Sequence, residues 1–119
     1  MRIGYGALLT AAAGLIVGCT NDPIPDEAKV TATDNMVFSP MTVVIKPGGT
    51  VTFVFHDVGH TVLFDPGVSG APEDITGTST NIEVQRTFAT LGTFNYHCTL
   101  HPGMVGRVIV AEEGTSLTE

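Results

Sequence analysis

The sequence has little of several residue types, and each shortage excludes a class of protein. It has 119 residues and only two cysteines, so at most one disulfide can form and a small disulfide-rich scaffold is excluded. Only five basic residues stand against 12 acidic ones, and a net charge of −7 does not suit nucleic-acid binding. Low-complexity repeats are also missing. With 43% hydrophobic residues, the chain is therefore expected to form one globular domain.

The one long apolar run lies at the N-terminus. Arg2 precedes "IGYGALLTAAAGLIVG", which is short for a membrane span and typical of a signal-peptide core. The run ends in "LIVGC", which resembles the lipobox of bacterial lipoproteins. That resemblance implies a lipoprotein signal peptide over residues 1–18 and lipidation of Cys19 as the mature N-terminus. An ordinary cleavage site with an incidental cysteine and an uncleaved anchor helix are the alternatives.

Lipidation of Cys19 would leave Cys98 as the only free thiol of an exported protein, which is unusual unless something occupies that thiol. After Cys19, "TNDPIPDEA" has two prolines, three acids and little to bury. Residues 19–28 are therefore expected to be the lipidated cysteine and a linker that spans roughly 30 Å when extended. Loss of residues 1–18 removes Arg2 and no acid, which changes the net charge from −7 to −8.

Residues 29–119 are expected to form the folded domain, because short β-like runs begin at Lys29. Turn signals such as "KPGGT" and "DPGVSG" separate these runs, which predicts an all-β sandwich or barrel. The one possible helix in the sequence is about one turn at "APEDI", residues 71–75. The seven predicted strands cover residues 29–33, 41–46, 50–56, 60–65, 82–88, 92–98 and 106–112.

Alternation of apolar residues predicts which face of each strand is buried. In residues 50–56, the side chains of Val51, Phe53 and Phe55 share one face, which should be the core face. The run at residues 82–88 is less regular, because Arg86 falls in phase with its apolar neighbours. Either a bulge or an edge position would explain this charge.

Alternation also sorts the residues of "GTFNYHC". Phe94, Tyr96 and Cys98 share one face, and Asn95 and His97 share the other. If the aromatic residues face the core, Cys98 is buried at the end of the strand and His97 lies outside. His97 is therefore not expected to bind a metal, and neither is His56.

Beyond the strand, the spacing is C-x2-H-x2-M, and "HPGM" predicts a tight turn. Cys98, His101 and Met104 thus bring a thiolate, an imidazole and a thioether together, a set that favours copper, with zinc as the second choice. A complete site needs a second imidazole, for which His60 is the best candidate. A catalytic cysteine is disfavoured, because no acid in phase with the strand could orient His101.

The stretches "GHTVLFD" and "GTFNYHCTLHPGMVGRVIV" resemble the cupredoxins, or type 1 blue copper proteins, and above all the plastocyanin branch. In that family the first histidine opens H-N-x-x-F-D, and Y-x-C-x-x-H is followed by a short loop, G-M-x-G and a final strand. The resemblance extends from about Lys29 to Glu112. It implies a Greek-key β-sandwich of about seven to eight strands and one type 1 copper ion. The implied ligands are His60, Cys98 and His101 in the equatorial plane and Met104 on the axis.

The sequence departs from the plastocyanin pattern in two places. Thr61 stands where plastocyanins usually have asparagine, so the side-chain hydrogen bond between the two ligand loops is expected to be either weaker or made differently. The loop between His101 and Met104 is two residues shorter than in plastocyanin and is similar to that of amicyanin. Neither departure removes a ligand.

The resemblance to cupredoxins implies one-electron transfer by a protein that is not an enzyme, and the resemblance to the lipobox implies that this protein is exported and lipid-anchored. The exposed edge of the His101 ring is the expected electron port. Backbone N–H groups of Thr61 and of residues after Cys98 are expected to donate hydrogen bonds to the sulfur. The sequence has no second cluster of histidines for a type 2 copper ion, so a self-contained oxidase or nitrite reductase is not expected.

The negative charge favours a partner with a cationic docking face, such as a c-type cytochrome or a membrane redox complex. Acidity that serves only the solubility of an exported protein is the alternative interpretation. The chain is expected to be a monomer, held by its lipid in the periplasm or on the outer face of the cell membrane. One alternative is a copper-binding module for copper storage or delivery. Another is an accessory domain of a redox enzyme complex.

Overall fold

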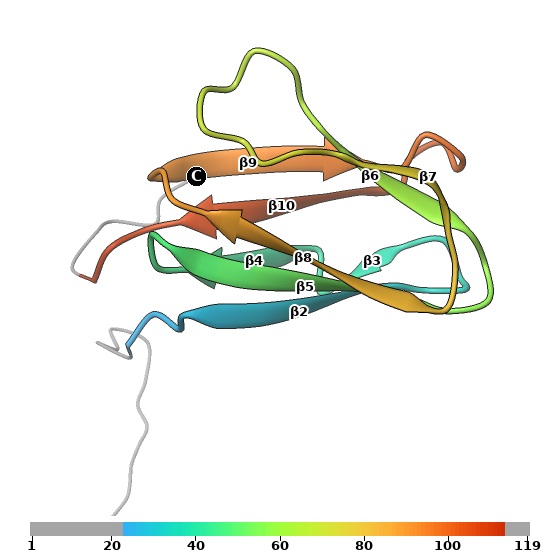
Figure 1. Ribbon diagram of the computed structural model, residues 1–119, viewed down its shortest axis with the longest axis horizontal. Helices are drawn as coiled ribbons and strands as arrows, with labels where there is room; N and C mark the ends of the chain where they lie inside the picture. Colours follow the sequence, from blue (N-terminus) through green and yellow to red (C-terminus); the bar gives the residue numbers. More distant parts are fainter. Residues whose placement is uncertain (1–22, 114–119) are drawn as a thin grey trace, which may run out of the picture.

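Two mixed β-sheets make up the computed structural model, which describes residues 23–113 (Figure 1). The expected signal peptide and the lipidation site Cys19 lie outside the described residues. The strands are β2 (Glu27–Ala32), β3 (Phe38–Ser39), β4 (Thr42–Ile45), β5 (Gly49–Phe55), β6 (His60–Phe64), β7 (Ile75–Ser79), β8 (Ile82–Phe88), β9 (Gly92–His97) and β10 (Val105–Val110).

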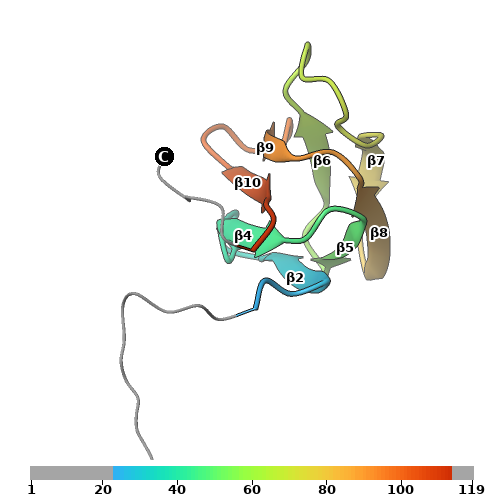
Figure 2. The ribbon, with the colours of Figure 1, turned by 90° about the vertical axis from the view of Figure 1, so that its left-hand side faces the viewer.

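The strand order is β4-β10-β9-β6-β7 in one sheet and β3-β2-β5-β8 in the other. Figure 2 shows the two sheets nearly end on. Strands β4 and β10 pair in parallel, as do β2 and β5, while the other pairs are antiparallel. The chain crosses repeatedly between the sheets, and the predicted all-β sandwich is confirmed. Residues 23–113 contain no membrane-spanning helix.

The core lies between the sheets and is rich in aromatic residues. Val51, Phe53 and Phe55 are buried, as the alternation predicts. Tyr96 on β9 occupies the middle of the aromatic cluster, with its ring centroid 4.8 Å from that of Phe38 and 5.4 Å from that of Phe53 in edge-to-face contacts. Such contacts join the two sheets and fix the end of β9, from which the chain continues to Cys98.

Residues 71–75 form no helix, so that prediction is wrong. Ile75 instead begins β7, a strand that the sequence did not predict. The reason is that β7 lies at the edge of its sheet, where "ITGTS" buries only Ile75 and lacks alternation. The pairing of β7 with β6 is irregular between His60 and Val62, and Gly77 has a φ of 74°.

Strand β8 is an edge strand, which explains the position of Arg86. The pairing of β8 with β5 runs without a break from Phe88 opposite Gly49 to Ile82 opposite Phe55, so no bulge is present there. The half-buried Arg86 side chain donates hydrogen bonds to the carbonyl oxygens of Glu73 (2.8 Å) and Asp74 (3.1 Å). Of the two explanations offered by the sequence, the edge position is the correct one.

Three loops gather at one end of the sandwich, on the right of Figure 1. They join β2 to β3 (residues 33–37), β5 to β6 (residues 56–59) and β9 to β10 (residues 98–104). At the other end, the Lys46 N–H donates to the Pro25 carbonyl oxygen (3.0 Å), and the Ile24 N–H donates to the Glu113 carboxylate (3.2 Å). Both ends of the described chain thus lie far from the three loops.

Candidate metal centre

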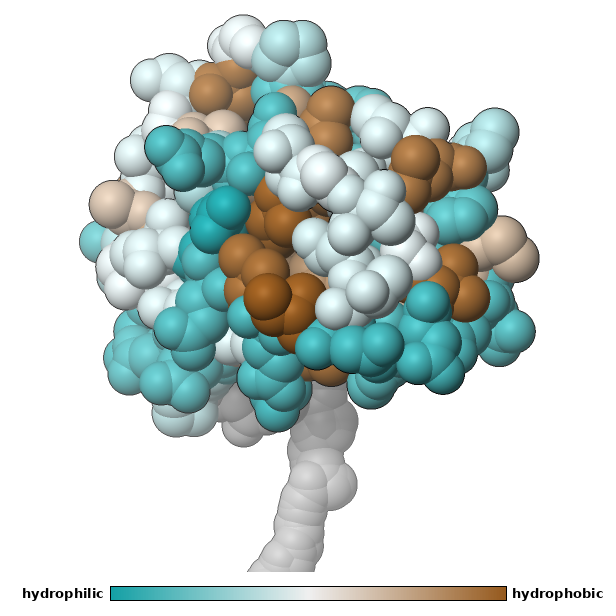
Figure 3. Space-filling model, turned by 45° about the vertical axis from the view of Figure 1, so that its right-hand side comes forward, coloured by the Kyte–Doolittle hydropathy of each residue, from teal (hydrophilic) through white to brown (hydrophobic). Residues whose placement is uncertain are grey.

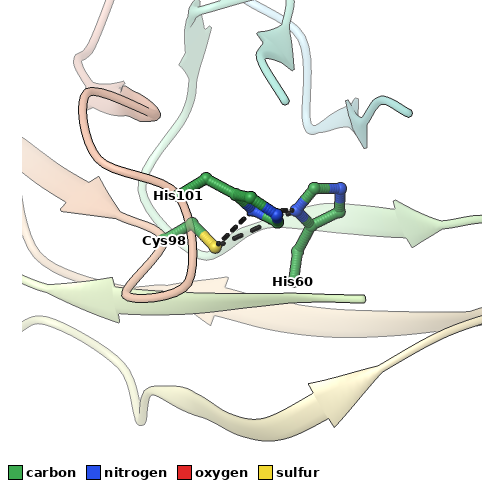
Figure 4. Close-up of side chains that lie close together, drawn as sticks. All are labelled: His60, Cys98 and His101. Carbon is green, nitrogen blue, oxygen red and sulfur yellow. Dashed lines mark hydrogen bonds between the residues drawn. The ribbon is translucent and has the colours of Figure 1, made fainter. Parts of the chain in front are cut away.

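His60, Cys98 and His101 converge at the end where the three loops meet (Figure 4). The Cys98 Sγ lies 3.9 Å from the His60 Nδ1 and 3.6 Å from the His101 Nδ1, and the two nitrogens are 3.2 Å apart. The circle through these three atoms has a radius of about 2.1 Å, close to the metal–nitrogen and metal–thiolate bonds of about 2.0–2.3 Å seen for zinc. One ion of this size can therefore reach all three atoms.

The orientation of His60 is set by the backbone of the β2–β3 loop. Its Nε2 lies 2.9 Å from the Thr33 carbonyl oxygen, so this nitrogen carries the proton and donates it. The Met36 N–H also donates to that oxygen, at 3.0 Å, and the Thr33 N–H donates to the Val37 carbonyl, at 2.9 Å. These bonds leave the lone pair of the His60 Nδ1 directed at the sulfur and at His101.

His60 is fully buried, and its environment favours the neutral ring. Burial lowers the pKa of His60, because charging a desolvated imidazole is unfavourable, and the nearby His101 acts in the same direction. The Thr33 carbonyl and the Asp34 carboxylate oppose this shift, and burial outweighs them. A neutral imidazole is the form that binds a metal ion.

The loop that begins at Cys98 is closed at its base by the Cys98 N–H, which donates to the Met104 carbonyl oxygen at 2.9 Å. Within it, the Met104 N–H donates to the His101 carbonyl at 3.1 Å, and Gly103 has a φ of 83°. Proline followed by a glycine with positive φ is typical of a type II turn, and the tight turn predicted at "HPGM" is confirmed. Met104 is only 2% exposed on this loop.

The Cys98 sulfur accepts hydrogen bonds from two backbone N–H groups. The Thr61 nitrogen lies 3.5 Å from the Sγ and the Leu100 nitrogen lies 3.4 Å from it. These are the backbone donors that the sequence analysis expected, and they fix the position of the sulfur. The two donors come from β6 and from the β9–β10 loop, so the sulfur is held from both sides.

Thr61 also joins the two ligand segments through its side chain. Its Oγ1 accepts a hydrogen bond from the Thr99 N–H at 2.9 Å and lies 2.9 Å from the Thr99 Oγ1. Thr61 stands in the place of the asparagine of plastocyanins, and its hydroxyl group connects β6 to the β9–β10 loop. Sequence reasoning identified the departure at Thr61 but missed Thr99 and the carbonyl of Thr33.

The other two histidines lie apart from the three converging side chains. His97 is half-buried and lines an outer groove of about 550 Å³ together with Asp65 and Arg107, and His56 is exposed. The three converging atoms are two imidazole nitrogens and a thiolate sulfur, with a buried methionine on the same loop. Such a soft trigonal set, with a thioether on the same loop, is the donor chemistry of a blue copper site, so the residues fit copper.

Comparisons with known proteins agree with this chemistry. Residues 26–111 match the model of the copper binding proteins of the plastocyanin/azurin family. The pseudoazurin of Methylorubrum extorquens is 31% identical over 121 residues, which cover 95% of this chain and 82% of that protein.

Two solved structures extend the comparison. The crystal structure of amicyanin from Paracoccus versutus has a TM-score of 0.61 and 31% identity, over 77% of this chain and 93% of that chain. A copper-containing nitrite reductase from Thermus scotoductus has a TM-score of 0.59 and 27% identity, but this match covers 76% of this chain and only 23% of the reductase.

Proposed function

The chain belongs to the plastocyanin/azurin family of copper-binding proteins, and from this membership we propose that it is an exported, lipid-anchored carrier of single electrons. The observation that carries the proposal is the convergence of the His60, Cys98 and His101 donor atoms at the loop end. Bound copper supplies the one-electron Cu(I)/Cu(II) couple. Similarity to pseudoazurin and amicyanin supports this function.

In this proposal His60, Cys98 and His101 would hold the copper ion, and Met104 would be a fourth, weaker ligand. Each of these three residues is held by backbone groups of other residues: His60 by the Thr33 carbonyl, the Cys98 sulfur by two N–H groups, and His101 by the N–H of Met104 in its turn. Donors fixed in this way move little when the charge of the site changes. A small rearrangement favours fast electron exchange.

His101 is the proposed electron port, because it is only half-buried while His60 and Cys98 are buried. Exposed apolar side chains lie on the loops at this end, among them Met36, Val37 and Leu100. Figure 3, which brings this end forward, shows apolar side chains grouped near the middle of the face, with hydrophilic ones below them. An apolar contact surface around the port would let a partner approach His101 closely.

Charge supports a cationic partner, such as a c-type cytochrome or a membrane redox complex. Asp34 and Asp57 are exposed on the β2–β3 and β5–β6 loops, at the same end as His101. Acidic side chains at the rim of a small, transient interface speed up association with a positively charged protein. Monomeric behaviour is part of this proposal.

The proposed lipid anchor would orient the domain. Pro25 lies beside Lys46, at the end of the sandwich opposite the metal centre, so a linker that precedes Pro25 leaves the domain there. A lipid on Cys19 would then hold the domain outside the cytoplasm with His101 directed away from the bilayer.

The full chain should partition into detergent, whereas Cys19→Ala should leave it uncleaved or release it as a soluble form. Recovery of the wild type without lipid in the aqueous phase would contradict the anchor.

Self-exchange of electrons distinguishes this carrier from a module for copper storage or delivery. Mixtures of the oxidised and reduced full chain should exchange electrons rapidly and should lose copper slowly to a chelator. Slow exchange combined with ready loss of copper would contradict the carrier and favour delivery. Enzymatic activity is not part of the proposal.

A further inference from the structure

The Thr61 hydroxyl has more acceptors around it than it has protons. Its Oγ1 lies 2.9 Å from the Thr99 nitrogen, 2.9 Å from the Thr99 Oγ1 and 3.8 Å from the Cys98 Sγ. The Thr99 N–H can only donate, so it occupies one lone pair of the Thr61 oxygen. The single Thr61 proton is left with two possible acceptors, the Thr99 hydroxyl and the sulfur.

Exposure and charge favour the sulfur as the acceptor. Thr99 is exposed, so its hydroxyl can make its hydrogen bonds with water and can donate its own proton to Thr61. Thr61 and Cys98 are 5% and 4% exposed, and the sulfur therefore depends on donors from the protein. A thiolate also accepts a stronger, charge-assisted hydrogen bond than a neutral hydroxyl does.

On the copper site proposed above, we propose that the Thr61 hydroxyl is a third hydrogen-bond donor to the Cys98 sulfur and that the Thr99 hydroxyl competes for the same proton. A hydrogen bond withdraws electron density from the thiolate, which weakens its donation to Cu(II) and favours Cu(I). Thr61 thereby raises the reduction potential, and Thr99 limits the increase. Both residues tune the site through Cys98 without contacting the ion.

Two isosteric substitutions separate this role from a purely structural one. Thr61→Val removes the donor but keeps the Thr61 N–H bond to the sulfur, so the reduction potential should fall. Thr99→Val keeps the Thr99 N–H bond to Thr61 but removes the competing acceptor, so the potential should rise. If Thr61 only connects the two loops, Thr99→Val leaves this connection intact and changes nothing.

The test uses the full chain loaded with copper, with the wild type first shown to have the intense thiolate-to-copper band. Absence of that band would contradict the proposed function, whereas a normal band with unmoved potentials would contradict only the role of Thr61. The redox equilibrium constant should change by up to about tenfold in opposite directions in the two variants, and tenfold corresponds to about 59 mV. The band should move to higher energy in Thr99→Val and to lower energy in Thr61→Val.

Thr61→Ser, which retains the hydroxyl, should stay close to the wild type, and so should Thr93→Val, an exposed control on β9. An unchanged potential in Thr61→Val, or shifts of the same sign in Thr61→Val and Thr99→Val, would overturn the proposal. If the Thr61→Val variant fails to load copper, the Thr99→Val variant still tests the proposal, because Thr99 is exposed. An unchanged or lower reduction potential in Thr99→Val would contradict the proposal.

Discussion

The His60 Nε2 lies 2.9 Å from the carbonyl oxygen of Thr33, a residue 27 positions earlier in the chain. This hydrogen bond places the proton on Nε2 and leaves Nδ1 available at the metal centre. Since a backbone oxygen is the acceptor, the orientation of the ring depends on the shape of the 33–37 loop. The shape of this loop thus determines which nitrogen of His60, a proposed ligand, carries the proton.

Replacement of His60 by alanine should weaken copper binding strongly, because the site loses one of its two imidazoles. Loss of a residue that only supports a metal ligand lowers the affinity by up to about 100-fold. Loss of the ligand itself should therefore lower the affinity for copper by more than about 100-fold. Competition with a chelator of known affinity measures this change. His56→Ala, which alters an exposed histidine outside the cluster, should leave the affinity unchanged. Equal affinities for His60→Ala and the wild type would exclude His60 as a ligand.

Replacement of Met104 by glutamine should keep copper bound but lower the reduction potential. A harder oxygen ligand favours Cu(II) over Cu(I), whereas the three equatorial donors continue to hold the ion. Loss of about 1.4 kcal/mol of preference for Cu(I) changes the redox equilibrium constant tenfold, or about 59 mV. Voltammetry of the wild type and the variant measures the shift. An unchanged potential would show that Met104 only packs the loop.

Replacement of Leu100 by glutamine should slow electron transfer to a soluble c-type cytochrome without changing the potential. Leu100 is 46% exposed beside the proposed port. Burial of a leucine side chain contributes about 1.5 kcal/mol or more to the stability of a complex, so its loss should slow electron transfer roughly tenfold. Leu91→Gln is a matched control, because Leu91 is 52% exposed just before β9, at the opposite end of the sandwich. Equal rates for the two variants, measured by stopped flow, would reject the port.

Replacement of Tyr96 by phenylalanine should stabilise the fold. Within the described residues the Tyr96 hydroxyl is buried without a hydrogen-bond partner, and burial raises the pKa of Tyr96. Phenylalanine keeps the ring contacts with Phe38 and Phe53 but removes the unsatisfied group, so the free energy of unfolding should rise by about 1 kcal/mol. Urea denaturation measures this change. A decrease would mean that the hydroxyl makes a favourable interaction.

The sequence predicted those parts of the molecule that depend on side-chain chemistry. Alternation identified the buried face of β5, and the spacing in "HCTLHPGM" identified the turn and three candidate ligands. Strand β7 was missed because an edge strand buries few side chains and shows no alternation. The role of Thr33 was missed for another reason: every residue has a carbonyl group, so a backbone acceptor has no sequence signal. The contact between Thr61 and Thr99 depends on how two distant segments pair in space.

The visible absorption spectrum of the full chain loaded with Cu(II) tests the central assignment most directly. Since Cys98 is the only cysteine among residues 23–113, a type 1 site there should give an intense thiolate-to-copper band. Cys98→Ser should abolish this band, while the exposed control His56→Gln should retain it. A wild-type chain that binds one equivalent of copper at His60 and His101 but shows no such band would contradict the type 1 copper centre.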